Sequence, residues 1–180
     1  MKATQAPLSL GFLLLLGFSP PARAEMVVQA CFSPQGKCSV HIVREIEQAK
    51  KELLVAVYAF TSDDLAAALA QAKKRGVLVQ VILDREFDAA NSNSKGKFLD
   101  AQKIAVRRIA GTKSAAPDKE TGLMHQKFAV IDRKSLLTGS YNWTHSADKI
   151  NDENLLLFRD AAPLAEEYRM VFLKLWERKP

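Results

Sequence analysis

The stretch Leu53–Asp84, "LLVAVYAFTSDDLAAALAQAKKRGVLVQVILD", decides the fold because it reads as a strand, a helix and a second strand. Both of its ends are continuous apolar runs, which are typical of strands covered on both faces. Residues 61–76 begin with Thr, Ser and Asp, carry an alanine–leucine stripe and end in a basic turn before Gly76, as helices do. Such a crossover is right-handed and predicts two parallel strands.

The same alternation continues on both sides of this unit. Apolar patterns predict strands at 26–32, 104–109 and 154–158, helices at 39–52, 98–102 and 163–176, and polar loops at 85–97 and 110–122. We therefore expect one α/β domain with a mixed, largely parallel sheet and helices on both faces, arranged as a three-layer sandwich. In such sheets the ligand site lies beyond the strand ends, where loops form its walls.

The first 24 residues have the pattern of a bacterial secretory signal peptide. Lys2 is followed by an apolar block of 11 residues, 8–18, and by Ala22-Arg23-Ala24, which fits a small-x-small cleavage site. The block is shorter than the roughly 20 residues that span a bilayer. We expect residues 1–24 to be removed and residues 25–180 to form a periplasmic or secreted domain, with an uncleaved anchor as the alternative.

Charge and cysteines add two further expectations. The leader holds two cations and no acid, so its removal lowers the net charge from +6 to +4, a modest excess that is compatible with a polyanionic partner. Cys31 and Cys38 are the only cysteines. In an oxidising compartment their spacing favours a local structural disulfide over two buried thiols.

His125 and Lys127 stand at the head of an apolar run in residues 122–144, "GLMHQKFAVIDRKSLLTGSYNWT". Side chains two apart on a strand share a face, so these two project together. Asp132 lies on the opposite face, roughly 16 Å along the strand from Lys127. We therefore expect Asp132 to be a structural partner rather than a catalytic group.

Folding this stretch as a hairpin brings further polar groups to the same place. If residues 133–134 form the tip, Lys127 lies opposite Ser140. In the same register His125 lies opposite Asn142, with directly opposed Cβ atoms about 5 Å apart. A three-residue loop would break this register. An imidazole, an ammonium, a hydroxyl and an amide with no carboxylate among them suit a phosphate.

The motif as a whole carries a resemblance. His125-x-Lys127, four residues, Asp132, six residues and Gly139-Ser140 reproduce the H-x-K-x4-D-x6-G-S/T signature of the phospholipase D superfamily. The chain resembles the short members of that family, which have a single motif and include the bacterial Nuc-type endonucleases. The resemblance implies a phospholipase D-like sandwich and a metal-independent phosphodiesterase with a phosphohistidine intermediate.

Segments outside the motif extend this resemblance over nearly the whole mature chain. They are Asn142, residues 151–158 with Glu153, and, upstream, residues 57–62 and 68–84. The family pattern implies that Glu153 orients the imidazole and stabilises its charged form. A solvated acid at a strand edge is the alternative for that residue.

A single motif leaves the reaction one group short. In-line displacement at phosphorus needs a nucleophile on one side and a proton donor for the leaving oxygen on the other. We therefore expect a twofold homodimer in which one neutral His125 attacks and the other, protonated, serves as acid and then as base. Both forms coexist near neutral pH because a free histidine titrates near 6.5. A monomeric site that uses His145 or His41 as the acid is the competing arrangement.

Groups other than histidine stabilise charge in this scheme. Both copies of Lys127 and Asn142 would hold the non-bridging oxygens, and Ser140 would add a hydrogen bond. We expect no metal and no other cofactor, because the three histidines, of which one is in the motif, are not part of a compact ligand cluster.

The substrate is the least determined part of the prediction. Basic residues at loops and element ends are Lys73, Lys74, Arg75, Lys95, Lys97, Arg107, Arg108, Lys113, Arg133 and Lys134. They favour a nucleic-acid backbone bound without sequence preference, although for Lys73–Arg75 the end of a helix is a sufficient explanation. A phospholipase D-type hydrolase or transphosphatidylase acting on phospholipid is the alternative, which the polar loops disfavour. A non-catalytic DNA-binding protein is a third possibility, and the intact motif argues against it.

Overall fold

A computed structural model describes residues 25–112 and 122–178 of the chain. The expected signal peptide and most of the loop at 110–122, including Lys113, lie outside these residues. Within the described residues, seven strands form one sheet in the order β1-β7-β6-β5-β2-β3-β4. They are β1 (Val27–Ser33), β2 (Glu52–Val57), β3 (Leu78–Asp84), β4 (Ala105–Ile109), β5 (Lys127–Ile131), β6 (Ser135–Gly139) and β7 (Glu153–Arg159).

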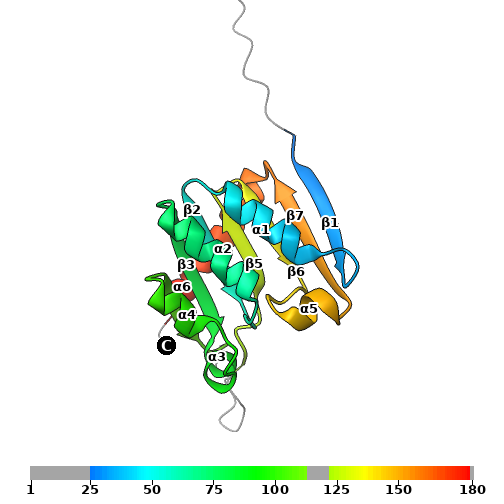
Figure 1. Cartoon of the computed structure of the whole chain (residues 1–180). Helices are drawn as coiled ribbons and strands as arrows, with labels where there is room; N and C mark the ends of the chain where they lie inside the picture. The colour runs from blue at the N-terminus through cyan, green and yellow to red at the C-terminus, as the bar shows by residue number, and fades with distance from the viewer. Residues whose placement is uncertain (1–24, 113–121, 179–180) are drawn as a thin grey trace, which may run out of the picture.

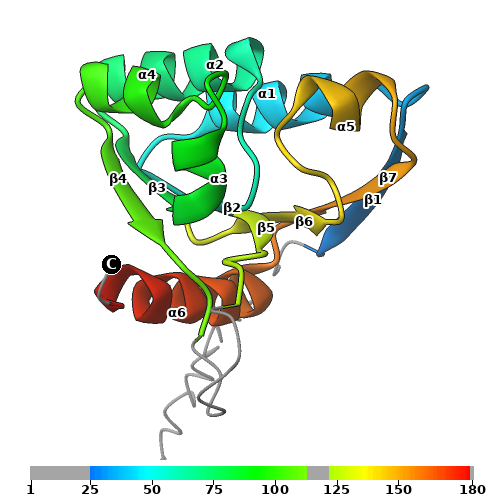
Figure 2. The same cartoon turned by 90° about the horizontal axis from the view of Figure 1, so that it is seen from below.

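Helices cover both faces of this sheet (Figures 1 and 2). They are α1 (Cys38–Gln48), α2 (Asp63–Lys74), α3 (Arg85–Ala90), α4 (Gly96–Ala101), α5 (His145–Lys149) and α6 (Ala162–Glu177). Figure 2 shows α1, α2, α4 and α5 on one side of the sheet and α6 on the other. None of the described helices is both long enough and apolar enough to cross a membrane.

The predicted fold class, a mixed α/β sheet with helices on both faces, is confirmed. Parallel pairing is limited to β2–β3 and β3–β4, however, and the other four pairings are antiparallel. Parallel strands are fewer than we expected because β5 and β6 form a hairpin, and β7 and β1 extend the sheet from it in antiparallel order.

Alternation along the strands fills a core on each side of the sheet. In β5, Ala129 and Ile131 join the buried cluster under α1 and α2, whereas Phe128 and Val130 join the cluster under α6. A strand that is buried at every position, as β2 is, therefore needs both helical layers.

Two elements differ from the prediction, and in the second of them a side chain caps the backbone. The helix predicted to run to residue 52 ends at Gln48, and Glu52 already belongs to β2. Residues 85–97, expected to form a loop, contain α3, whose N-cap is Asp84. The carboxylate of Asp84 accepts hydrogen bonds from the backbone N–H groups of Glu86 and Phe87 and so stabilises the first turn.

The predicted hairpin register is wrong by one residue. Ile131 pairs with Ser135, and Phe128 pairs with Thr138, so the loop has three residues, 132–134. Asp132 has a left-handed φ of 52°, and its carboxylate accepts hydrogen bonds from the backbone N–H groups of residues 50–52 at 2.7–3.0 Å. These contacts fix the loop against the start of β2, and as a result Lys127 does not lie opposite Ser140.

Gly139 ends β6 at a place that no other residue fits well. Its φ is 151°, and a Cβ there would collide with the backbone oxygen of Asn154 on β7. The close approach lets the N–H of Ser140 donate to that same oxygen at 3.1 Å. Glycine thus turns the chain directly before the Ser140 segment.

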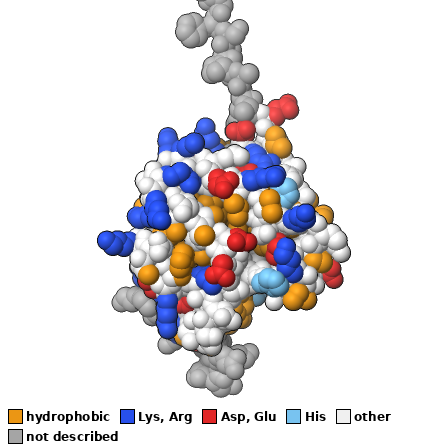
Figure 3. All heavy atoms as spheres, viewed as in Figure 1, with side chains coloured by type: hydrophobic (Ala, Val, Ile, Leu, Met, Phe, Trp, Pro, Cys, Tyr) orange, Lys and Arg blue, Asp and Glu red, His pale blue; other side chains and the backbone are white. Residues whose placement is uncertain are grey.

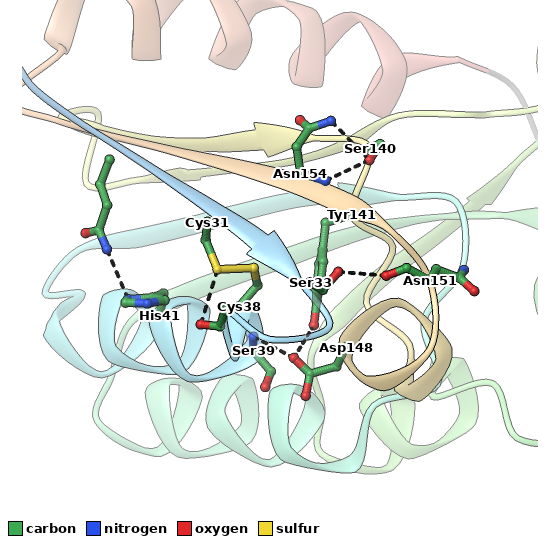
Figure 4. The surroundings of a disulfide bond; sticks show 12 residues. Cys31, Ser33, Cys38, Ser39, His41, Ser140, Tyr141, Asp148, Asn151 and Asn154 are labelled. Carbon is green, nitrogen blue, oxygen red and sulfur yellow. Dashed lines mark hydrogen bonds between the residues drawn. A yellow bond between two sulfur atoms is a disulfide. The ribbon is translucent and has the colours of Figure 1, made fainter.

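Cys31 and Cys38 form a disulfide with an S–S distance of 2.08 Å, the arrangement that their spacing favoured. The bond joins β1 to the first residue of α1 (Figure 4). Both cysteines are buried. It therefore anchors the edge strand of the sheet to the helical layer.

Candidate active site

The candidate site lies where four neighbouring strands meet the same edge of the sheet. Tyr58 follows β2, His125 precedes β5, Ser140 follows β6, and Glu153 begins β7. Because the order β7-β6-β5-β2 makes these strands neighbours, the four strand ends lie side by side. The tertiary pairing thus brings together residues that are 95 positions apart in the sequence, from 58 to 153.

The imidazole of His125 is exposed and rests on an aromatic support. Its ring centroid lies 4.8 Å from that of Tyr58, at an interplanar angle of 56°. Tyr58 in turn packs on Phe87 of α3 at 5.3 Å. The backbone N–H of Tyr58 donates to the carbonyl of Gln126 at 2.8 Å, which fixes the segment next to His125. The histidine is therefore exposed to solvent while its ring is supported by Tyr58.

Lys127 lies beside this ring and is half buried. Its Nζ donates to the carbonyl of His125 at 3.0 Å and stands 5.2 Å from the centroid of the Tyr58 ring. Burial lowers the pKa of Lys127, and the charge of Glu153 opposes that change. A partly desolvated ammonium with few fixed partners gains stability when an anion approaches it.

Ser140 and Glu153 are paired directly. The hydroxyl of Ser140 donates to Oε2 of Glu153 at 2.5 Å. It also accepts from the backbone N–H and the side-chain amide of Asn154, at 3.1 and 3.3 Å, as Figure 4 shows. Nδ2 of Asn151 donates to Oε1 of Glu153 at 3.4 Å. Glu153 is therefore held by Ser140 and Asn151, and among the described residues no hydrogen bond joins it to His125.

Asn142 is oriented by the backbone after β2. Its Oδ1 accepts from the N–H of Ala59 at 3.3 Å, which leaves the amide NH₂ as the donor end. The N–H of Trp143 donates to the carbonyl of Ala59 at 3.0 Å, so the Asn142 segment is tied to the same strand end as Tyr58.

Among the described residues, the remaining sequence candidates take no part in these contacts of the cluster. Asp132 lies at the far end of β5 in the hairpin loop, and Gly139 shapes the turn before Ser140. His41, on α1, interacts through Nδ1 with Nε2 of Gln29 at 3.4 Å. His145 is exposed at the start of α5.

Sequence reasoning missed three residues of the site: Tyr58, Asn151 and Asn154. Tyr58 lies in an apolar run and therefore looks like a core residue in the sequence. Only the pairing of β2 with β5 reveals its contact with His125. Asn151 and Asn154 flank Glu153 in "NDEN", a polar group before a strand that was a usable signal.

The cluster combines an exposed imidazole, a half-buried ammonium and amide donors at one edge of the sheet. Across residues 25–112 and 122–178, no three His, Cys, Asp or Glu side chains gather as metal ligands would. The absence of a metal requirement stays a prediction, and the donor set itself is one that binds and polarises a phosphate.

Comparison with family models gives a match over most of the chain. Residues 42–176 match the model described as "Cardiolipin synthase, PLD-like domain". A protein of Rickettsia typhi named phospholipase D is 34% identical over 151 residues, which are 84% of this chain and 69% of that protein. A mitochondrial cardiolipin hydrolase of Canis lupus familiaris is 37% identical over 149 residues, which are 82% of this chain and 53% of that protein.

Two solved structures share the fold over almost their whole length. Nuc from Salmonella typhimurium, a phospholipase D family member, has a TM-score of 0.73 at 29% identity and is matched over 95% of its chain and 84% of this one. NucT from Helicobacter pylori has a TM-score of 0.80 at 29% identity, with 97% of its chain and 85% of this one matched. The chain belongs to the phospholipase D superfamily of phosphodiesterases and is of the Nuc type.

Proposed function

We propose that this protein is an exported, metal-independent endonuclease that hydrolyses the backbone of DNA or RNA without sequence preference, at a site shared by two subunits. The observation that carries the proposal is the convergence of His125, Lys127 and the Ser140–Glu153 pair at one edge of the sheet. The disulfide between Cys31 and Cys38 supports export, since such bonds persist in oxidising compartments.

The reaction takes two displacements at phosphorus. A neutral His125 ring nitrogen attacks the phosphorus, a P–N bond forms, and the P–O bond to the leaving group breaks. The protonated His125 of the second subunit gives its proton to the departing oxygen. That imidazole, now neutral, takes a proton from water, whose oxygen attacks phosphorus, and the P–N bond breaks. The first histidine is restored, and the product leaves as a phosphomonoester.

Lys127 and Asn142 hold the non-bridging oxygens during both displacements. The ammonium of Lys127 neutralises charge that grows in the transition state, and the NH₂ of Asn142 donates a hydrogen bond. Glu153 has a modified role in this scheme. Because Ser140 donates to it at 2.5 Å, Glu153 fixes the Ser140 hydroxyl. The negative charge of Glu153 also stabilises a nearby imidazolium.

Two observations favour nucleic acid over phospholipid as the substrate. The likeness to Nuc and NucT covers 95% and 97% of those chains, whereas the match to the cardiolipin hydrolase covers 53% of that relative. Nuc-type endonucleases are also the members that the sequence resembles. The likeness over whole chains therefore favours a nuclease.

The distribution of charge allows only weak, nonspecific binding. Several of the expected cations are paired with acids of the same chain: Lys95 with Asp63, Arg108 with Asp88 and Asp100, and Arg133 with Glu52. On the face drawn in Figure 3, basic and acidic side chains are interspersed and form no single basic patch. We therefore expect binding to rest mainly on the site itself and to depend only moderately on salt, because few unpaired cations remain to contact phosphates.

Hydrolysis of phospholipid is the second candidate function. It is supported by the relatives named phospholipase D and mitochondrial cardiolipin hydrolase, which are 34% and 37% identical to this chain. The same phosphohistidine chemistry would serve both substrates.

The deciding experiment incubates the mature protein with plasmid DNA, with RNA and with phospholipid vesicles, all in excess EDTA. We expect the plasmid to be nicked and linearised while the vesicles stay intact. A His125→Ala variant is the control in each assay. Release of a lipid head group with intact plasmid would assign the second function instead, and activity that needs added Mg²⁺ would contradict the mechanism.

A further inference from the structure

We infer that Asp84, the last residue of β3, is a positioning residue for His125, an inference that rests on the proposed role of that histidine. Asp84 is 1% exposed, and it lies outside the family motif. Its Oδ2 accepts the backbone N–H of Met124, the residue before His125, at 2.9 Å. Its Oδ1 accepts from the N–H groups of Glu86 and Phe87 at 3.1 and 2.9 Å.

The two oxygens reach His125 by two separate routes. Through Oδ2, Asp84 fixes the backbone of the segment that enters β5. Through Oδ1, it fixes the first turn of α3 and hence Phe87, which packs on Tyr58 at 5.3 Å. Tyr58 in turn supports the imidazole at 4.8 Å. One buried carboxylate therefore controls both the backbone of His125 and the surface under its ring.

Only a carboxylate satisfies all three donors. An ionised Asp offers acceptors on both oxygens and no donor, so three N–H groups can face it without repulsion. An asparagine at the same place would point its NH₂ group either at the N–H of Met124 or at the N–H groups of Glu86 and Phe87, so that two donors would face each other. A serine is a good N-cap and still accepts from the start of α3, but its side chain ends one bond short of Oδ2.

This arrangement matters because in-line attack is sensitive to small displacements. A misplacement of about 1 Å in a reacting group costs on the order of 100-fold in rate. Ground-state binding of the phosphate depends on Lys127 and Asn142, which do not contact Asp84. Loss of the carboxylate therefore lowers kcat more than it raises KM.

The test uses Asp84→Asn and Asp84→Ser with the chromogenic diester bis(p-nitrophenyl) phosphate in EDTA, below the unfolding temperature of each variant. We expect kcat to fall by about 10- to 100-fold, with KM changed by less than about threefold. Asp84→Ser keeps the cap of α3, so its unfolding temperature stays nearer to that of the wild type. Either soluble variant with wild-type kcat, or with KM alone altered, overturns the inference.

Asp88→Asn is the matched control. Asp88 is also on α3 and pairs with Arg108 at 2.6 Å, but it does not contact Met124. We expect this variant to be less stable, because the buried carboxylate of Asp88 holds both Arg108 and Ser94, and to retain kcat within about twofold, because neither contact reaches His125. An equal loss of kcat in Asp88→Asn would reduce Asp84 to a general support of α3 and overturn its specific role.

Hydrogen exchange tests the clamp without any substrate. In both Asp84 variants the peptide that covers Met124 should exchange faster than in the wild type, while peptides of β2 should be unchanged. Unchanged exchange at Met124 would contradict the inference. If the wild type cleaves none of the phosphodiesters, the proposed function fails, and the exchange result alone still decides whether Asp84 positions this segment.

Discussion

The two ends of strand β5 differ in how completely their polar groups are satisfied. At the hairpin end, the carboxylate of Asp132 accepts three backbone N–H groups from residues 50–52. At the other end, the ring of His125 is exposed, and Lys127 is half buried with its charge turned to a carbonyl and a ring. One strand of five residues thus connects an end whose polar groups are hydrogen-bonded within the protein to an end whose polar groups are available to a ligand.

The comparison teaches that one motif serves two physical tasks. The Asp132 end adds stability because three backbone N–H groups donate to one fixed carboxylate. The His125 end gives up some stability, because groups that are left to bind a phosphate have fewer partners in the free protein.

His125→Ala should abolish activity, with a loss of at least about 10⁴-fold in kcat, because the nucleophile is removed. The unfolding temperature should change little, since the side chain is exposed. Steady-state kinetics and calorimetry on the same sample make the two measurements. Residual activity within tenfold of the wild type would exclude His125 as nucleophile.

The same variant tests the shared site. Wild-type chains are refolded with an increasing excess of His125→Ala chains. Activity per wild-type chain should then fall toward zero, because each mixed dimer holds only one His125. Sedimentation analysis should show dimers throughout. Constant activity per wild-type chain would favour a monomeric site with His145 or His41 as the acid.

Lys127→Met should lower kcat/KM by about 100- to 1000-fold, through the loss of the charge that stabilises the transition state. Methionine keeps much of the packing against Tyr58, so the fold should be retained. Kinetics at several salt concentrations check the prediction. A rise in KM with kcat unchanged would restrict Lys127 to ground-state binding.

Asp132→Ala should lower the free energy of unfolding by about 2–3 kcal/mol, because three backbone donors lose their acceptor. The loss of stability should exceed the loss in kcat when the enzyme is assayed well below its unfolding temperature. Urea denaturation measures the change, with Asp132→Asn as the partial variant that keeps one acceptor oxygen. A stable but inactive Asp132→Ala protein would contradict the division between the two ends.

Asp148→Asn should change how stability depends on pH. Burial opposes ionisation of Asp148, but hydrogen bonds from Lys149, from the N–H of Ser39 and from the hydroxyl of Tyr141 outweigh it and lower its pKa to about 2. The ionised form is therefore favoured by folding. This contribution, about 2 kcal/mol, is present above pH ~4 and is lost as the pH falls toward 2.

Acid denaturation of wild type and variant makes the measurement. The difference between their free energies of unfolding should be largest at neutral pH and should shrink between pH 4 and pH 2. A difference that is constant over this range would mean that the charge of Asp148 does not contribute. The hydrogen bond of Tyr141 to Asp148 at 2.8 Å places the effect next to Ser140 and Asn142, so a parallel loss of activity in acid is also expected.

Sequence patterns predicted most of the elements but not the details that caps decide. The continuous runs at 53–60 and 77–84 predicted β2 and β3, since a run apolar on both faces has few alternatives. The start of α3 at Arg85 was missed because its signal is the single carboxylate of Asp84, which closes the apolar run of β3 before a polar segment. Local composition carries little information about which backbone N–H a side chain reaches.

For the site, the motif predicted which residues gather but not how they face one another. Ser140 was expected opposite Lys127, and the three-residue loop moved it by one position. Glu153 was expected to meet the imidazole, and the structure pairs it with Ser140 instead. A shift of one residue turns a strand's side chains to the other face, and it depends on contacts of Asp132 with a segment about 80 positions earlier in the chain.

Periodicity, cysteine spacing and residue chemistry are local properties, and they were enough to predict a core on each side of the sheet, the disulfide and the candidate reactive groups. Only the tertiary structure decided the hairpin register, the aromatic support of Tyr58 under His125 and the hold of Asp84 on the adjacent backbone. Each of these depends on strand pairing between distant segments, where a displacement of about 3.3 Å, one residue, changes every contact.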